Sequence, residues 1–221
     1  MKKIFKYMMT AALAAAAAAP LSACGGNEPD YCDYISELRH EIYLYEDDDI
    51  GIQVHLSSRE TPYLTDGYKG EMGEICEIFV KFSQNIDGVT AKIGQSGGEM
   101  NYMSVTDSYY LSFTAGETGD SVQVTLTYGG ADRNFDLPSA LYEGVIAPET
   151  ALECVRQYDA DTFAALTEGK NFKGEIYVRL LADGGKCYYY VGVTDRDGNT
   201  RAYLVDGESG NIIAEREHDA R

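Results

Sequence analysis

The sequence predicts a mainly β fold, with an antiparallel β-sandwich followed by a small α+β domain in which a helix packs on an antiparallel meander. Apolar residues alternate with polar ones in short runs between residues 50 and 128, as in strands with one buried face. A clear helical pattern appears only afterwards, at Pro148–Tyr158. Strand-like runs separated by tight-turn signals then continue toward the C-terminus.

The composition is that of a folded acidic protein. The chain has 221 residues, a formal net charge of −18 and 44% hydrophobic residues. These values suit a globular chain of one large or two small domains. The acidic balance argues against nucleic acid as a partner, because phosphate binding needs clustered lysines and arginines.

Residues 1–23 have the pattern of a secretory signal peptide. Lys2, Lys3 and Lys6 give a basic start, and an uncharged, alanine-rich stretch follows. The stretch is too short to span a bilayer comfortably. Without this segment, residues 24–221 carry 15 basic and 36 acidic residues, a net charge of −21.

The end of this segment, Leu21-Ser22-Ala23-Cys24, resembles the bacterial lipobox. The resemblance implies cleavage before Cys24 and attachment of diacylglycerol to its sulfur. Two acyl chains hold a protein stably on a membrane, so we expect an extracytoplasmic lipoprotein anchored to a bacterial membrane. The alternative is an ordinary signal peptide with a chance cysteine. Residues 24–30 then form a short flexible tether.

Residues 31–144 are predicted to form the sandwich. A helical turn or two is expected within residues 31–40. The alternating runs lie around residues 50–56, 76–82, 89–93, 109–113 and 121–128, and residues 132–138 form an edge strand. Glycine-containing turn signals separate the runs. The alternation favours antiparallel pairing, because parallel strands buried on both faces would read as continuous apolar runs.

Residues 145–221 are predicted to form the second domain. Ala151, Leu152, Val155 and Tyr158 share one face of the predicted helix, and Pro148 suits its first turn. A further helical turn is expected at residues 161–166. The predicted strands are residues 175–181, 186–194, 200–205 and 211–217.

This C-terminal third resembles a PepSY domain. The resemblance rests on the helix "PETALECV", the hairpin "GKCYYYVGVTDRDGNTRAYLVD" and the ending "DGESGNIIAE". The matching positions are Tyr190, Val191, Asp197, Gly198, Tyr203, Val205, Asp206, Gly210 and Ile212. It implies a helix on an antiparallel sheet, in a non-catalytic extracytoplasmic module often tied to regulation or inhibition of peptidases. No binding residues carry over, because the matching positions are turns and core.

Four cysteines remain besides Cys24. The apolar stripe of the helix and the strand face that it would cover bring Cys154 and Cys187 together, which predicts a Cys154–Cys187 disulfide and leaves Cys32–Cys76. The alternative is buried free thiols. No CxxC or histidine cluster indicates zinc.

Other chemistry-bearing residues have simpler interpretations. The acidic run at residues 46–49 could bind calcium, but a solvated hairpin turn is favoured there and at residues 195–199. The histidines His40, His55 and His218 are far apart, and His55 lies on the polar side of its strand, where we expect it to be solvated. No nucleophile elbow, HExxH or P-loop motif occurs, so we expect neither an enzyme nor a bound metal or cofactor.

Two tyrosines are the candidate partner contacts. Alternation places Tyr188 and Tyr190 on the face opposite Tyr189. If the helix covers Tyr189, the other two face the first domain, solvent or a partner protein, and tyrosine is favoured at interfaces. The expected function is a non-catalytic envelope binding module that regulates or inhibits an exported peptidase. The alternative is a structural or adhesin-like surface protein.

Overall fold

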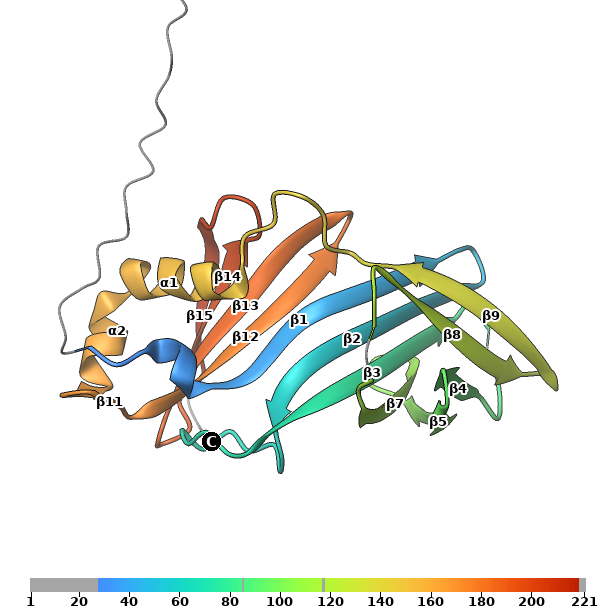
Figure 1. The fold of residues 1–221 in the computed structure, drawn as a ribbon, viewed down its shortest axis with the longest axis horizontal. Helices are drawn as coiled ribbons and strands as arrows, with labels where there is room; N and C mark the ends of the chain where they lie inside the picture. The colour runs from blue at the N-terminus through green and yellow to red at the C-terminus, as the bar shows by residue number, and fades with distance from the viewer. Residues whose placement is uncertain (1–27, 85, 117, 219–221) are drawn as a thin grey trace, which may run out of the picture.

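The computed structural model describes residues 28–84, 86–116 and 118–218, which form a mainly β protein (Figure 1). A nine-stranded sheet has the order β15-β14-β13-β12-β1-β2-β3-β7-β6, and a four-stranded sheet has the order β5-β4-β8-β9. A short two-stranded sheet joins β10 to β11. Cys24 and most of the predicted tether lie outside the described residues. None of the helices in the described ranges has the length and apolar character needed to cross a membrane.

The elements have these bounds: η1 Tyr31–Tyr34, β1 Ile35–Glu46, β2 Ile50–Glu60, β3 Met72–Phe82, β4 Thr90–Ile93, β5 Ser96–Glu99, β6 Asn101–Met103, β7 Ser108–Thr114, β8 Ser121–Tyr128, β9 Ala131–Pro138, α1 Pro148–Tyr158, α2 Ala160–Ala165, β10 Thr167–Glu168, β11 Asn171–Phe172, β12 Gly174–Asp183, β13 Lys186–Asp195, β14 Thr200–Asp206 and β15 Ile212–His218.

The predicted helix Pro148–Tyr158 and the strand Ser121–Tyr128 are confirmed at the residues predicted. The expectation for residues 31–40 is wrong beyond its first turn. After the 3-10 turn η1, the chain enters the long strand β1 at Ile35. The acidic run is the hairpin turn between β1 and β2, where Asp47 Oδ1 accepts from the backbone amides of Asp49 and Ile50 at 2.8 and 2.9 Å.

Strand β1 joins the two predicted domains into one sheet. It pairs antiparallel with β2 on one side and parallel with β12 on the other, with Leu38 opposite Val178. All the other strand pairs described are antiparallel, as predicted. The nine-stranded sheet therefore continues across the boundary predicted between residues 144 and 145.

A β-bulge at His40 decides which way the side chains of β1 point. Arg39 lies opposite Ser57, and Glu41 lies opposite Leu56, so His40 is the extra residue. The bulge reverses the alternation. Consequently, Tyr43 after the bulge packs on the same face of the sheet as Leu38 before it.

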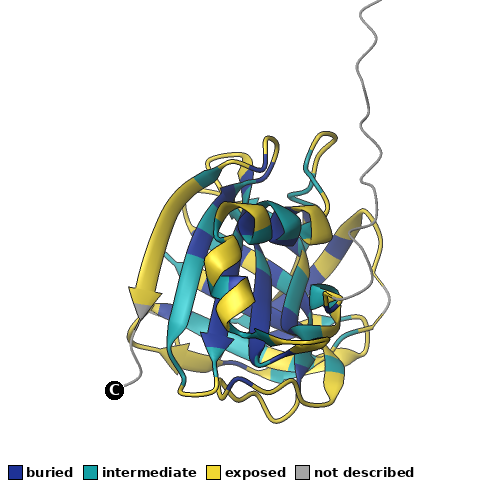
Figure 2. Ribbon diagram, turned by 90° about the vertical axis from the view of Figure 1, so that its left-hand side faces the viewer, coloured by how far each residue is buried: buried dark blue, intermediate teal, exposed yellow. Residues whose placement is uncertain are grey.

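That face, called here the covered face, is buried under two different structures. Helix α1 covers β12–β14, where the helix cluster includes Leu152, Val155, Val178 and Val191 (Figure 2). The four-stranded sheet covers β2, β3 and β7, where the sandwich cluster includes Val54, Ile78, Val124 and Leu126. The second packing is that of a β-sandwich, which was predicted. The opposite side of the nine-stranded sheet is the open face.

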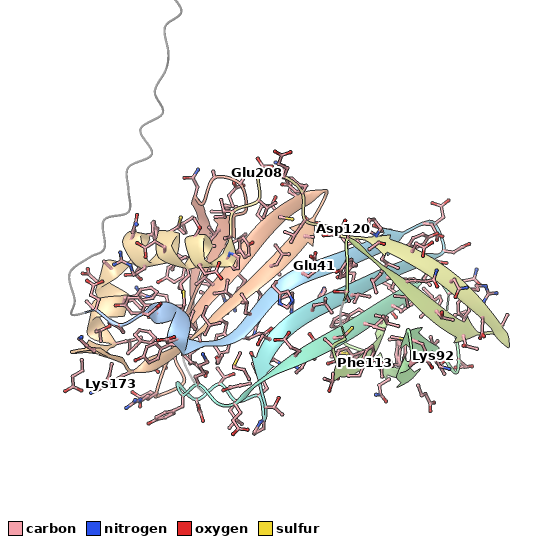
Figure 3. The ribbon with its side chains drawn as sticks, in the orientation of Figure 1. Glu41, Lys92, Phe113, Asp120, Lys173 and Glu208 are labelled. Carbon is pink, nitrogen blue, oxygen red and sulfur yellow. The ribbon has the colours of Figure 1, made fainter. Side chains whose placement is uncertain are left out.

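The connection between β9 and α1 is tied down along its length. Ala140 N donates to Ile42 O at 2.7 Å, and Ser139 Oγ donates to Glu41 Oε1 at 2.7 Å. Farther on, the Tyr142 hydroxyl donates to Glu208 Oε1 at 2.8 Å. Figure 3 shows Glu41 on β1 and Glu208 on the turn beyond β14. The segment thus lies along the nine-stranded sheet rather than forming a free linker.

The predicted disulfides are absent, and Cys32, Cys76, Cys154 and Cys187 are free thiols. Cys32 packs against the helix cluster, whereas Cys76 belongs to the sandwich cluster, so this pair cannot bond. Cys187 lies in the helix cluster as predicted, but its Sγ donates to Ala140 O at 3.3 Å. Cys154 Sγ lies instead beside Gly210, where an added Cβ would be only 2.7 Å from the sulfur.

Candidate binding site on the open face

The open face holds a group of charged side chains that are mostly buried. Glu37 and Glu77 are 2% and 6% exposed, and three arginines stand beside them on adjacent strands. We call this group the arginine cluster: Arg39 on β1, Arg59 on β2, Arg179 on β12, Glu37 on β1 and Glu77 on β3. Strand alternation places all five on one face, with Arg39 opposite both Ser57 and Arg179.

Two of the arginines are well paired. Arg179 Nη2 donates to Glu37 Oε2 at 2.7 Å and to the Tyr63 hydroxyl at 2.5 Å. Although burial opposes the charge, the Glu37 hydrogen bond keeps the pKa of Arg179 above its ordinary value. Arg59 Nη1 donates to Glu77 Oε1 at 3.3 Å, and that oxygen also accepts from the Tyr110 hydroxyl.

Arg39 is the poorly compensated member of the cluster. Its Nη2 reaches Glu37 Oε1 only at 3.9 Å, and its side chain is 14% exposed. Burial lowers its pKa, and the attraction of Glu37 and Glu77 only partly offsets this. Arg179 and Arg59 lower it further. Three guanidinium groups against two carboxylates leave a net positive charge within the arginine cluster of an otherwise acidic chain.

Several buried polar atoms here have no hydrogen-bond partner among the described residues. They are the Nε atoms of Arg39, Arg59 and Arg179, Ser57 Oγ and His55 Nδ1. Buried polar atoms without partners cost free energy in a folded protein and are rare. Their concentration on three adjacent strands marks this face as a candidate site.

His55 connects the arginine cluster to a groove. It lies two residues before Ser57 on β2, and its ring is 5.0 Å from that of Phe79. His55 is partly buried rather than solvated, so the prediction for its side chain is wrong. Burial lowers its pKa to about 3, and Arg39 contributes to the shift. The imidazole is therefore neutral at physiological pH.

The groove has a volume of about 640 Å³ and follows the open face of β1–β3 to the tip of the β12–β13 hairpin. We call it the side groove. Its walls combine apolar residues, such as Leu44, Phe79 and Ala182, with charged residues of both signs. The charged residues are Lys81, Lys186, Glu46 and Asp183. This mixture and this volume are within the range of ligand-binding clefts.

Aromatic rings and a loop border the arginine cluster. The rings of Tyr177 and Tyr190 lie 5.4 and 5.2 Å from the Arg179 guanidinium, and Tyr63 lies 5.0 Å from that of Arg59. Tyr190, a predicted partner contact, is partly buried here. Tyr188 is also partly buried and shares the open face by alternation, whereas Tyr189 is buried beneath α1.

Residues 61–71 form the loop over this border, and two buried carboxylates hold it. Glu60 accepts from the backbone amides of Leu64 and Gly70 at 3.0 and 2.6 Å. Glu175 lies beneath the loop and accepts from the Tyr177 hydroxyl. Burial raises the pKa of Glu175 to about 7, against the Gly67 amide, which lowers it. Gly67 has φ +80, and a Cβ there would lie 2.6 Å from Asp195 O.

Potential metal ligands are not grouped together in the part of the chain that the structure describes. Within residues 28–84, 86–116 and 118–218, no group of three or more His, Cys, Asp or Glu residues is placed to hold a metal ion. The turn at residues 195–199 is closed by its own hydrogen bonds, with Asp195 Oδ1 accepting from the Asp197 and Asn199 amides.

Comparisons with family models, curated proteins and solved structures found no match for this chain. The PepSY resemblance therefore remains a prediction. By its fold, the chain is a mainly β protein with a sandwich, a helix-covered meander and a charged open face.

Proposed function

We propose that this protein is a lipid-anchored, non-catalytic binding module of the bacterial envelope, and that it binds its partner through the open face. The observation that carries the proposal is the arginine cluster. Buried guanidinium groups without full partners destabilise a fold, so their presence points to a purpose other than stability. Arginine and tyrosine are also among the residues enriched at binding hot spots.

An exported peptidase is the partner that we propose, as the PepSY resemblance suggests. Residues 25–221 contain the whole described body, so they are suitable for a binding and inhibition assay against purified serine, cysteine and metallopeptidases. We expect at least one peptidase class to bind or to be inhibited. Absence of both across the panel, together with self-association or glycan binding, would favour the structural or adhesin-like alternative.

A pair of tyrosine variants tests the surface. Tyr190→Ala alters the open face, whereas Tyr158→Ala alters α1 on the other side, where Tyr158 is 57% exposed. We expect Tyr190→Ala to weaken peptidase binding at least tenfold and Tyr158→Ala to leave it unchanged. Equal effects of the two variants would contradict binding through the open face.

The anchor is a separate part of the proposal. If Cys24 carries the lipid, the Cys24→Ser variant should move from the membrane fraction to the soluble fraction or remain as an uncleaved precursor. Mass spectrometry of the parent should show a diacylated N-terminal Cys24. A parent that begins at another residue would refute the lipobox assignment.

A further inference from the structure

We propose that Arg39 and its neighbours bind the α-carboxylate of a peptide whose last residues lie in the side groove. This inference rests on the proposed function.

The charge requirement is the first step. Arg39 is a largely buried cation that makes no hydrogen bond to a described residue, and its nearest carboxylate oxygen is 3.9 Å away. Glu37 and Glu77 are already engaged by Arg179 and Arg59 at 2.7 and 3.3 Å. A ligand carrying one negative charge would bring the cluster to neutrality. An anion of higher charge would leave the cluster with a net negative charge.

The geometry of the donors is the second step. A guanidinium presents parallel N–H groups that match the two oxygens of a carboxylate. In Arg39 these groups have no bidentate partner among the described residues, because the contact to Glu37 is 3.9 Å long. Of the Arg39 side chain, 14% is accessible. Ser57 Oγ, opposite Arg39 in the register, is a further buried hydroxyl without a partner.

The side groove is the reason to choose a peptide rather than a free acid. The groove begins at His55, which is two residues, or about 7 Å, along β2 from Ser57. Phe79 and Leu44 offer apolar contacts for side chains, and Gln53 offers amide hydrogen bonds. A small carboxylate held at Arg39 would leave all of these contacts unused.

The test compares a matched pair of ligands by isothermal titration with residues 25–221. One is an acetylated tetrapeptide, Gly-Ala-Leu-Ala, with a free C-terminal carboxylate, and the other is the same peptide with a C-terminal amide. We expect the free acid to bind at least tenfold more tightly than the amide and than acetate. Equal affinities of acid and amide, equal affinities of acid and acetate, or no binding would overturn the proposal.

Three variants assign the site. Arg39→Met should weaken binding of the free acid at least tenfold, and Arg39→Lys should restore part of it. Arg133→Met is the matched control, since Arg133 stacks on Tyr128 at 4.0 Å in the four-stranded sheet. If Arg133→Met weakened binding as much as Arg39→Met, the assignment would be wrong.

The outcomes separate this inference from the proposed function. If a peptidase binds in a Tyr190-dependent manner but the tetrapeptide acid does not, only the carboxylate assignment fails. If the tetrapeptide binds through Arg39 but no peptidase does, the carboxylate assignment stands and the choice of partner fails.

Discussion

At the scale of single residues, Glu175 connects the stability of the protein to pH. Its side chain is fully buried, and its folded-state pKa of about 7 lies above the ordinary value of 4.5. The folded protein therefore holds a proton that the unfolded chain releases. The stability that this group contributes is fully present below pH 4.5 and is lost as the pH rises toward and beyond 7.

The variant Glu175→Gln tests this coupling, because glutamine imitates the protonated carboxyl. From the pKa difference, the parent should lose about 2 to 3 kcal/mol of unfolding free energy between pH 5 and pH 8 relative to the variant. Urea unfolding across this pH range measures the difference. Any contribution from the titration of His55 cancels, because both proteins contain this residue. The control Glu143→Gln, at an exposed position, should show the same pH dependence of the unfolding free energy as the parent. If the parent and Glu175→Gln showed the same pH dependence, the raised pKa of Glu175 would be refuted.

Asp159 is a second residue with a definite structural role. It accepts hydrogen bonds from Tyr203, Arg201 and Thr162, and it is the N-cap of α2. These contacts hold its pKa well below the usual range, against the effect of burial. We expect Asp159→Ala to cost about 2 to 3 kcal/mol in thermal or urea unfolding. Asp161→Ala, an exposed position of the same helix, should cost less than about 0.5 kcal/mol.

At the scale of elements, the bulge of β1 carries the architecture. Because His40 reverses the alternation, deleting it would turn either residues 35–39 or residues 41–46 to the wrong face. If residues 35–39 turned over, Arg39 would be buried under α1. If residues 41–46 turned over, Tyr43 would leave the sandwich cluster. We therefore expect the deletion to prevent folding or to cost more than about 4 kcal/mol, as measured by urea unfolding.

His40→Ala is the matched control, since the exposed side chain of His40 can be removed while the extra residue stays. It should change the unfolding free energy by less than about 0.5 kcal/mol. A deletion variant as stable as His40→Ala would show that the bulge has no role in setting the two faces.

The bulge also explains what the sequence could and could not predict. Helix α1 and β8 follow one uninterrupted period each, and both were predicted at their observed residues. Strand β1 changes its alternation at His40, so residues 31–40 gave no strand signal. Its parallel pairing with β12 depends on residues about 140 positions apart, which local patterns do not report.

The candidate site was predicted only in part. Alternation correctly separated Tyr190 from the buried face of Tyr189. Alternation also predicted that His55 is solvated, because the polar side of a strand usually faces solvent. Here, the ring of Phe79, long arginine side chains and the 61–71 loop bury much of that side, which is a tertiary effect. Charged residues at alternate positions, as in Glu37 and Arg39, were the available signal.

At the scale of the whole molecule, the shared sheet predicts a single unfolding unit. Cys76 and Cys187 are both 2% exposed, one in the sandwich cluster and one in the helix cluster. Burial raises the pKa of both thiols, to about 12 for Cys76. They should therefore react with alkylating reagents only when the protein opens.

The variant Leu152→Ala tests whether the two clusters unfold together. Leu152 is buried in the helix cluster, and its truncation should cost about 2 to 5 kcal/mol. If the sheet opens as one unit, alkylation of both thiols, followed peptide by peptide with mass spectrometry, should accelerate at least tenfold. Exposed Thr150→Ala on the same helix should change neither rate. Acceleration of Cys187 alone would show two independent domains.

If the arginine cluster serves binding, it is retained although it lowers the stability of the fold. The most direct measurement is the unfolding free energy of Arg39→Met against the parent, in urea and without added carboxylate. Since methionine keeps the apolar stem and removes a poorly compensated charge, we predict an increase of about 1 kcal/mol. A loss of about 2 kcal/mol or more would mean that Arg39 stabilises the fold, and would contradict the account.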